Sequence, residues 1–147
     1  KVFKREYKEW GVRIETGVET FTSYLAGLLR EKRLNPGADK VEVAYQDPFQ
    51  LSRDLGETEE ARMVIRAYAV CKEMLCHGKD TMWAGNILMK EWMPEVILQV
   101  AAARIRNARN VRVNTIVTAS VSEYVSLKDV EQNDVKIVSL EELILGE

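Results

Sequence analysis

The stretch NTIVTA, residues 114–119, decides the fold class of this chain. Its four central residues, Thr115 to Thr118, are all β-branched, and such side chains favour the pleated surface of a strand. The stretch also lacks a regular alternation of polar and apolar residues, which is typical of a strand covered on both faces of a parallel sheet. We therefore predict that residues 114–119 form a central strand.

Strands and helices alternate on both sides of this central strand. Further strands are expected at 12–15, 41–46, 70–75 and 135–138. Helices are expected at 18–33, 59–69, 82–108, 121–130 and 140–145, with Pro94 starting a new helix or kinking a long one. This alternation implies parallel strands joined by right-handed crossovers. We predict an α/β fold with a doubly wound, mostly parallel sheet of about four or five strands and helices on both faces.

Helical spacing also predicts which side chains face inward. The expected apolar positions of the first three long helices are Val18, Phe21, Tyr24, Leu25, Leu28 and Leu29, then Ala61, Val64, Ile65 and Tyr68, then Val96, Ile97, Val100, Ala101 and Ile105. Thr58 is expected to cap the helix that follows it, and Gly78 to Asp80 to form a turn.

The composition is that of a soluble globular protein. The 147 residues are enough for a single domain, 1–147, with its own core. Charged residues make up 30% and the net charge is -2, with both signs spread along the chain, so we expect no nucleic-acid partner. Apolar runs are too short to span a bilayer. The charged opening KVFKREYKEW resembles no targeting peptide, so we expect a cytoplasmic fragment of a longer protein.

The two cysteines, Cys71 and Cys76, and the neighbouring His77 raise the question of a metal site. Two thiols cannot supply the four ligands of a usual iron–sulfur cluster. A strand over 70–75 would also direct the cysteines to opposite faces. We therefore expect no metal there, and we expect His77 to be a solvated surface group.

In a doubly wound sheet, ligands bind beyond the carboxyl ends of the strands. The loops after Tyr45, Leu75 and Ala119 are therefore the expected place for chemistry. These loops contain no glycine-rich dinucleotide or triphosphate motif. Ser120 and Ser122 follow a strand, but no GxSxG motif surrounds them and no second histidine is present, so a hydrolase is not expected.

The same loops resemble one known family. The run VAYQDPFQLSRDLG, residues 43–56, is similar to a pattern in which a strand leads into YHDPCHLGR, and TEEARMVI, residues 58–65, is similar to the helix that contains the family's Pro-Arg. The stretches GKDTMWAGN, IVTASVSEY and IVSLEELI follow in the family's order, and EYKEWG resembles the linker after a first repeat. Over nearly its whole length the chain resembles the cysteine-rich CCG domain of heterodisulfide reductase and glycolate oxidase iron–sulfur subunit-like proteins.

Some residues of the family pattern are retained and the cluster cysteines are not. The retained residues are Tyr45, Asp47, Pro48, Leu51, Arg53, Arg62 and Gly85. The cysteine positions are held by Phe49, by Met82 and Trp83 (or Trp83 and Ala84 in the shifted register), and by Ser120 and Glu123. Iron–sulfur clusters need thiolate ligands, which none of these side chains supplies. The resemblance therefore implies a degenerate carboxyl-terminal repeat whose own domain carries no cofactor.

If these positions still converge, we expect Phe49, Met82 and Trp83 to fill the space of a cluster as core. Asp47 and Pro48 would shape a turn, and Arg53 would pair with a carboxylate or a loop carbonyl. A wider group of large side chains, Met82, Trp83, Met89, Trp92 and Met93, forms either buried core, the commoner outcome, or an exposed contact stripe.

Two functions remain open from the sequence. The resemblance implies an accessory domain that docks to other subunits of an iron–sulfur oxidoreductase, with the cluster elsewhere in the full protein or complex, and with any membrane contact made through partners. The alternative is a binding module for a small molecule or a protein in the remodelled pocket, at the loops around Phe49, Trp83 and Ser120.

Overall fold

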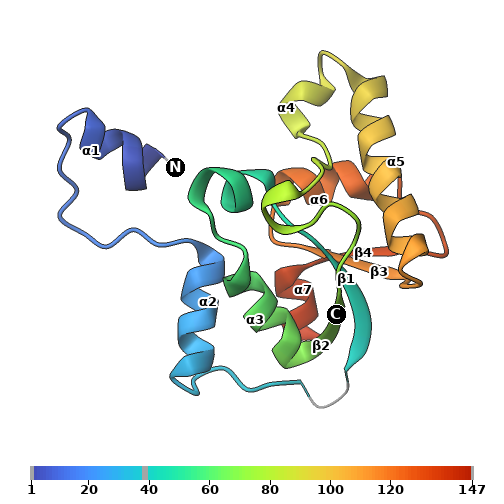
Figure 1. Ribbon diagram of the computed structural model, residues 1–147, viewed down its shortest axis with the longest axis horizontal. Coiled ribbons are helices and arrows are strands. Elements are labelled where there is room, and N and C mark those ends of the chain that lie inside the picture. The colour runs from blue at the N-terminus through green and yellow to red at the C-terminus, as the bar shows by residue number, and fades with distance from the viewer. Residues whose placement is uncertain (1, 38–39, 147) are drawn as a thin grey trace.

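A sheet of four parallel strands forms the centre of the molecule (Figure 1). The structure is a computed structural model that describes residues 2–37 and 40–146. The strands are β1 (Val41–Gln46), β2 (Ala69–Lys72), β3 (Thr115–Thr118) and β4 (Lys136–Ser139). They lie in the order β2-β1-β3-β4, and each neighbouring pair is parallel. The predicted central strand, β3, is one of the two inner strands.

Helices cover both faces of the sheet. The helical elements are η1 (Val2–Glu6), α1 (Tyr7–Glu9), α2 (Phe21–Arg30), η2 (Gln50–Leu55), α3 (Glu59–Tyr68), η3 (Gly78–Asp80), α4 (Ile87–Lys90), α5 (Pro94–Asn110), α6 (Val121–Lys128) and α7 (Leu140–Leu145). Helices α2, α3 and α7 pack on one face, and α5 and α6 pack on the other (Figure 1). The predicted doubly wound α/β fold is confirmed.

Two apolar cores lie on the two faces of the sheet. One contains Val43 and Tyr45 of β1 and Ile65 of α3. The other contains Ala44 of β1 and Ile105 of α5. Because successive side chains of a strand point to opposite faces, β1 supplies both cores and is buried on both sides.

Serine, threonine and proline set several helix starts. The Thr20 hydroxyl accepts a hydrogen bond from the Ser23 amide at 3.2 Å and caps α2. Ser120 caps α6 in the same way, and Ser139 forms a capping box with Glu142 at the start of α7. Pro94 stands in the first turn of α5, where its missing amide hydrogen leaves no bond unmade, so the prediction of a new helix there is confirmed.

Several predicted boundaries are wrong. Residues 12–15 form no strand, and residues 82–86 form no helix. β2 ends at Lys72 instead of residue 75, because the chain then turns, with Cys76 in a left-handed conformation at φ 54°. Thr58 makes no capping hydrogen bond through its side chain, and its carbonyl oxygen accepts from Arg62 instead.

Some side chains predicted to face the core are exposed. On α2 the buried apolar side is Leu25 and Ala26, while Phe21 and Tyr24 face outward. Val96 at the start of α5 is also exposed, whereas Ile97 is buried as predicted. The exposed positions lie in the first turn of each helix, whereas Leu25, Ala101 and Ile105 further along are buried as predicted.

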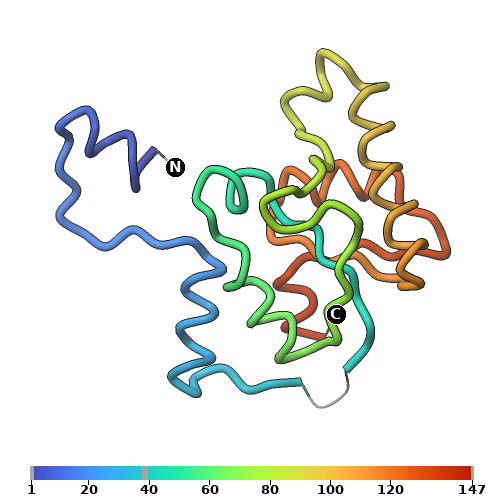
Figure 2. The backbone as a smooth tube through the Cα atoms, in the orientation of Figure 1, coloured from blue at the N-terminus to red at the C-terminus, as the bar shows by residue number. Residues whose placement is uncertain are grey.

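The amino-terminal segment lies apart from the sheet and its helices (Figure 2). No residue of η1 or α1 is buried. We call residues 2–18 the arm. None of the helices within residues 2–37 and 40–146 has both the length and the apolar character that crossing a bilayer requires.

Candidate functional site

The candidate site lies at the carboxyl ends of β1 and β3. The strand order reverses between these two strands, since the chain leaves β1 toward β2 and returns to β3 on the other side. Crevices at such a point are where doubly wound folds bind ligands. Three buried polar side chains, Gln46, Asp47 and Glu123, meet there, and each comes from the end of β1 or the start of α6.

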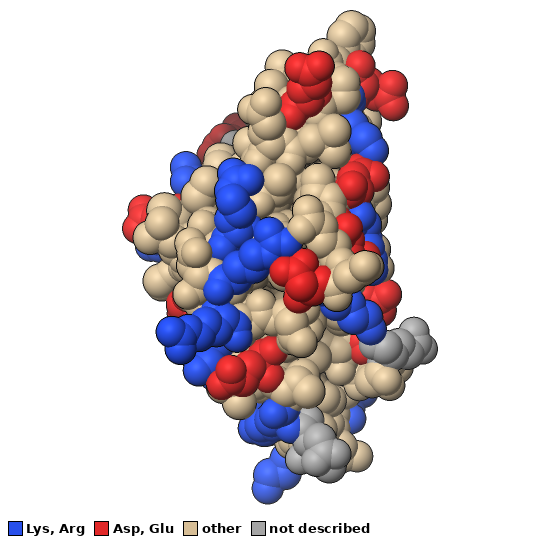
Figure 3. Space-filling model, turned by 90° about the vertical axis from the view of Figure 1, so that its right-hand side faces the viewer, with Lys and Arg blue, Asp and Glu red and all other residues tan. Residues whose placement is uncertain are grey.

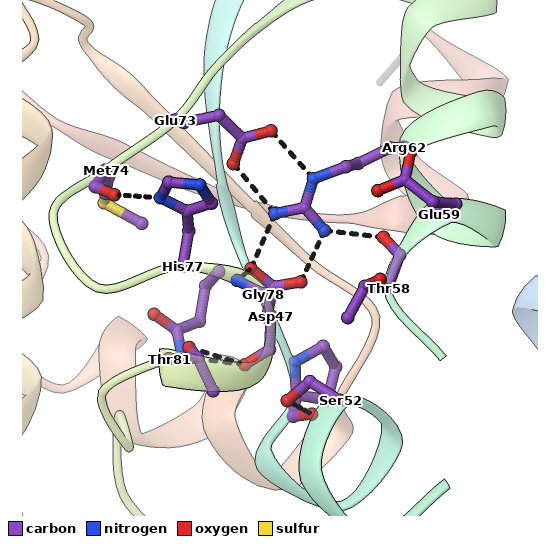
Figure 4. Close-up of polar contacts among 12 residues, drawn as sticks. Asp47, Ser52, Thr58, Glu59, Arg62, Glu73, Met74, His77, Gly78 and Thr81 are labelled. Atoms are coloured by element: carbon purple, nitrogen blue, oxygen red, sulfur yellow. Dashed lines mark hydrogen bonds and ion pairs between the residues drawn. The ribbon is translucent and has the colours of Figure 1, made fainter. Parts of the chain in front are cut away.

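Asp47 is held by a guanidinium group (Figure 4). Arg62 of α3 donates to both of its carboxylate oxygens, Nη1 to Oδ1 at 2.6 Å and Nη2 to Oδ2 at 2.8 Å. The amide of Gly78 donates to Oδ2 at 2.8 Å. Both charged side chains are almost fully buried, at 3% and 1% exposed. The pair is therefore a bidentate ion pair inside the protein.

Arg62 makes as many contacts as its guanidinium allows. Its Nε and Nη2 donate to the two carboxylate oxygens of Glu73 at 2.7 and 2.8 Å, and Nη1 also donates to the Thr58 carbonyl at 2.6 Å. Burial acts to lower the pKa of Arg62, but the hydrogen bonds to Glu73 and Asp47 outweigh it and raise the pKa. All five N–H groups are directed to protein acceptors, so Arg62 offers no donor to a ligand.

Glu123 forms the second polar centre. Its Oε1 accepts from the Phe49 amide at 3.1 Å, and its Oε2 accepts from Gln46 Nε2 at 2.8 Å. Gln46 Nε2 also donates to the Met82 carbonyl at 2.9 Å. Glu123 thus ties the start of α6 to the loop after β1 and, through Gln46, to the segment before α4.

Burial dominates the titration of Glu123. It raises the pKa of the carboxyl to about 7, although the Phe49 amide, Gln46 and the charge of Arg104 all act to lower the pKa. The carboxyl is 1% exposed, so water cannot compensate for the loss of hydration. Glu123 therefore changes charge near neutral pH.

Arg104 of α5 completes this centre on the face of the sheet that α5 and α6 cover. Its Nε donates to Gln46 Oε1 at 2.5 Å, and its Nη1 donates to the Leu75 carbonyl at 2.8 Å. Because a guanidinium can only donate, it fixes the orientation of the Gln46 amide, whose NH2 must then point to Glu123. Arg104 Nη2 is buried and has no hydrogen-bond partner among the described residues, and burial lowers the pKa of Arg104.

The structure brings together most of the predicted pocket positions. Phe49 and Met82 meet Glu123 and Gln46 through backbone atoms, and Ser120 accepts from the Glu123 amide at 3.3 Å. The side chains of Phe49, Met82 and Trp83 are only half-buried. The expectation that these three fill the centre as apolar core is therefore wrong, because the Glu123 carboxyl and Gln46 occupy it.

Most of the residues that carry the resemblance have structural partners. Arg53 donates from Nη2 to the Thr81 carbonyl at 2.8 Å and lies 4.8 Å from the centre of the Phe49 ring, so the predicted bond to a loop carbonyl is confirmed. Tyr45 packs in the core with its ring centre 5.3 Å from Arg62. The Pro48 carbonyl accepts from the Ser52 hydroxyl at 3.0 Å, and Leu51 is half-buried.

Gly85 is required by both space and conformation. Its φ is 120°, and a Cβ built on it would lie 2.7 Å from the Cβ and Oγ of Ser126 and 3.0 Å from a methyl of Ile97. Only glycine fits where this segment passes between α5 and α6.

The remaining candidates stay apart from this centre. Burial raises the pKa of the Cys71 thiol to about 11, which makes it a poor nucleophile. His77 is exposed, as predicted, and its Nδ1 lies 2.9 Å from the Met74 carbonyl. The Ser122 hydroxyl accepts from the Ile87 amide. No group of three or more His, Cys, Asp or Glu side chains within residues 2–37 and 40–146 is arranged to hold a metal ion.

Two hollows flank Ser120 at the carboxyl edge of the sheet. One of about 330 Å³ lies against Thr20, Thr22 and Pro48. The other, of about 300 Å³, lies against Tyr124 and the start of α7. Glu57 accepts hydrogen bonds from the hydroxyls of Thr20 and Thr22, so the first hollow carries a negative charge at its edge.

The sequence predictions missed Gln46, Glu73 and Arg104. In the sequence, Gln46 is a polar residue at the end of a predicted strand, and Glu73 is a charged residue inside the strand predicted at 70–75. Arg104 falls on the apolar side of α5 between Ala101 and Ile105, a spacing that could have marked it as buried.

Comparisons with protein-family models, with curated proteins and with solved structures find no match to this chain.

Proposed function

We propose that this chain is a cluster-less accessory domain of a heterodisulfide-reductase-like iron–sulfur oxidoreductase subunit. It supports electron transfer by docking to other subunits or domains in the cytoplasm, and the cluster lies elsewhere in the full protein or complex. The observation that carries the proposal is the Glu123 carboxyl, which stands at one cysteine position of the family pattern with both oxygens bonded to the protein.

The donor set does not fit an iron–sulfur cluster. Clusters are held by thiolates, whereas the positions in question offer a carboxylate, a hydroxyl, a thioether and aromatic rings. The Ser120 hydroxyl caps α6, and Glu123 is bonded to Phe49 and Gln46. A cluster would have to displace these bonds and would gain no soft ligand in return.

The contacts of the retained motif residues also support this proposal. Asp47 and Arg62 join the ends of β1 and α3 and, through Glu73, the segment after β2. These contacts join three segments at the carboxyl edge of the sheet through protein groups. Asp47 and Arg62 therefore stabilise the fold, which is a reason for their presence even where the cluster cysteines are replaced.

The direct test is the iron and acid-labile sulfide content of this chain after anaerobic reconstitution, measured beside the longest natural version of the protein. We expect no iron in this chain and a stoichiometric cluster in the longer protein or its complex. The positive control carries cysteine at Phe49, Met82, Trp83, Ser120 and Glu123. One cluster for each molecule of the unaltered chain would overturn the proposal.

A second function rests on the hollows at Ser120. Their volumes, about 300 and 330 Å³, are at the lower end of the range for small-molecule sites. Trp83 lines neither hollow, so its fluorescence is not the best reporter of a ligand there. A thermal-shift screen of small thiols and hydroxy acids tests this function, and a stabilisation lost in Ala119→Phe, which fills the edge shared by both hollows, would favour it.

A further inference from the structure

The arm presents apolar side chains that the body of the molecule does not cover. Phe3 and Trp10 are 58% and 64% exposed, and Tyr7 lies between them with ring centres 5.2 and 6.1 Å away. The arm bends back on itself around a hollow of about 830 Å³, and residues between Phe3 and Val18 line it. Such a hollow is large enough for several side chains of a partner.

A second uncovered apolar surface lies at the far end of the molecule, where α4 turns into α5 (Figure 1). We call residues 87–98 the tip. Its exposed apolar residues are Ile87, Leu88, Met89, Trp92, Met93, Val96 and Leu98. Trp92 is 85% exposed, and Met89 and Met93 are exposed as well, so the expectation of buried core is wrong for these three. Met82 and Trp83, which were expected in the same group, are half-buried. Clusters of exposed apolar residues mark interaction surfaces.

The two surfaces have opposite charge. Lys4, Lys8 and Arg13 line the hollow of the arm, against a single acidic residue, Glu15. The tip carries two glutamates, at 91 and 95, on either side of Trp92 and Met93, and the nearby Lys90 is paired with Asp129 at 2.6 Å. Figure 3 shows acidic side chains at the upper end of the molecule, which is the α4–α5 end, whereas both signs lie near each other lower down.

We propose that the arm of one copy receives the tip of a second copy, with the indole of Trp92 in the hollow and the basic residues of the arm against the tip's glutamates. The contact is reciprocal, so two arms and two tips close a two-fold dimer. The inference rests on the proposed function, because it names one partner of a docking domain.

Sedimentation velocity over a range of protein concentrations tests the apolar part of this proposal on the whole chain. We expect a monomer–dimer equilibrium whose Kd rises at least tenfold in Trp92→Ser, since buried tryptophans carry much of the energy of an interface. The matched control is Leu145→Ser, which removes an apolar side chain that is 69% exposed on α7, away from the tip. Its Kd should remain that of the unaltered chain.

A charge exchange tests the pairing itself. Lys8→Glu with Arg13→Glu makes the arm acidic, and Glu91→Lys with Glu95→Lys makes the tip basic. Each double variant alone should lose the dimer. A mixture of the two should recover it as a heterodimer, because both of its contacts then join opposite charges. If the arm instead binds the tip of its own molecule, mixing the two variants would not restore a dimer.

A monomer at every concentration would overturn the dimer, and so would a dimer whose Kd neither Trp92→Ser nor the charge variants change. Iron measured on the same samples separates this outcome from the proposed function. A monomer without iron would refute only the dimer, and a dimer with a cluster would refute only the cluster-less role.

Discussion

Arg62 stabilises the carboxyl edge of the sheet by joining Asp47 to Glu73. Replacement by Met would leave the buried Asp47 carboxylate without its counter-charge, and breaking a buried pair in this way costs about 3–5 kcal/mol. We expect Arg62→Met to lower the free energy of unfolding in urea by this amount.

The control for this prediction lies one turn further along the same helix. Arg66 pairs with Glu59 at 3.6 Å, and both side chains are more than half exposed. Arg66→Met should therefore change stability by less than about 1 kcal/mol. Similar losses in both variants would show that Arg62 acts through helix propensity and not through its buried contacts.

Glu123 predicts a pH dependence of stability. Its pKa rises from 4.5 in the unfolded chain to about 7 in the fold, so the folded state binds more protons between these values. Stability from this group is full below about pH 4.5 and is lost as the pH rises through 7, by about 3 kcal/mol in total. Urea unfolding at pH 5 and pH 8 measures the difference.

Glu123→Gln provides the matched control, because the amide keeps the shape of the side chain and cannot titrate. We expect Glu123→Gln to lose less free energy of unfolding between pH 5 and pH 8 than the unaltered protein, because most of the loss that comes from Glu123 is removed. A pH profile that is the same in both proteins would show that the carboxyl is ionised throughout, held by Phe49 and Gln46.

At the residue scale, the sequence could identify motif positions but not their partners. Asp47 and Arg62 belong to the pattern, and of the two partners expected for Arg53, a carboxylate or a loop carbonyl, the structure shows the carbonyl. The contact of Arg62 with Glu73 depends on how the chain turns after β2, and the contact of Gln46 with Arg104 depends on α5 crossing the opposite face. Both contacts join residues that are far apart in the sequence, so a helical or strand periodicity cannot predict them.

Gly85 determines how the segment before α4 passes between α5 and α6. Alanine at this position would meet Ser126 at 2.7 Å and would adopt an unfavourable φ of 120°. We expect Gly85→Ala to lower the free energy of unfolding by about 2–3 kcal/mol. Gly27→Ala in α2 is the control, since a Cβ there has nothing within 4 Å, and it should stabilise the protein by up to about 1 kcal/mol. Chemical denaturation compares the two, and equal effects would contradict the steric argument.

At the scale of elements, β1 has the predicted bounds, and α3, α6 and α7 start at the predicted residues. β1 and β3 follow from β-branched and apolar runs, and α7 begins and ends at the predicted residues. The prediction failed where a tertiary contact ends an element. The Asp47 carboxylate binds the Gly78 amide, which holds the chain after β2 in a turn, and residues 82–86 cross Gln46 as an extended loop because its amide binds the Met82 carbonyl.

For the whole molecule, the two cores share one sheet, so we expect the described body to unfold as a unit. Ile65 belongs to the core under α3 and Ile105 to the core under α5, and both are almost fully buried. Ile65→Ala and Ile105→Ala should each lower the free energy of unfolding by about 2–5 kcal/mol. The double variant should show the sum within about 0.5 kcal/mol, because the two cavities lie on opposite faces and share no neighbour across the sheet.

Urea unfolding followed by far-ultraviolet circular dichroism and by tryptophan fluorescence checks this cooperativity. Trp83 reports the segment that contacts the second core, while circular dichroism reports helices on both faces. Coincident midpoints that shift together in both single variants are the expected result. A fluorescence midpoint that moves only in Ile105→Ala would mean that the two faces unfold independently, although β1 supplies side chains to both cores.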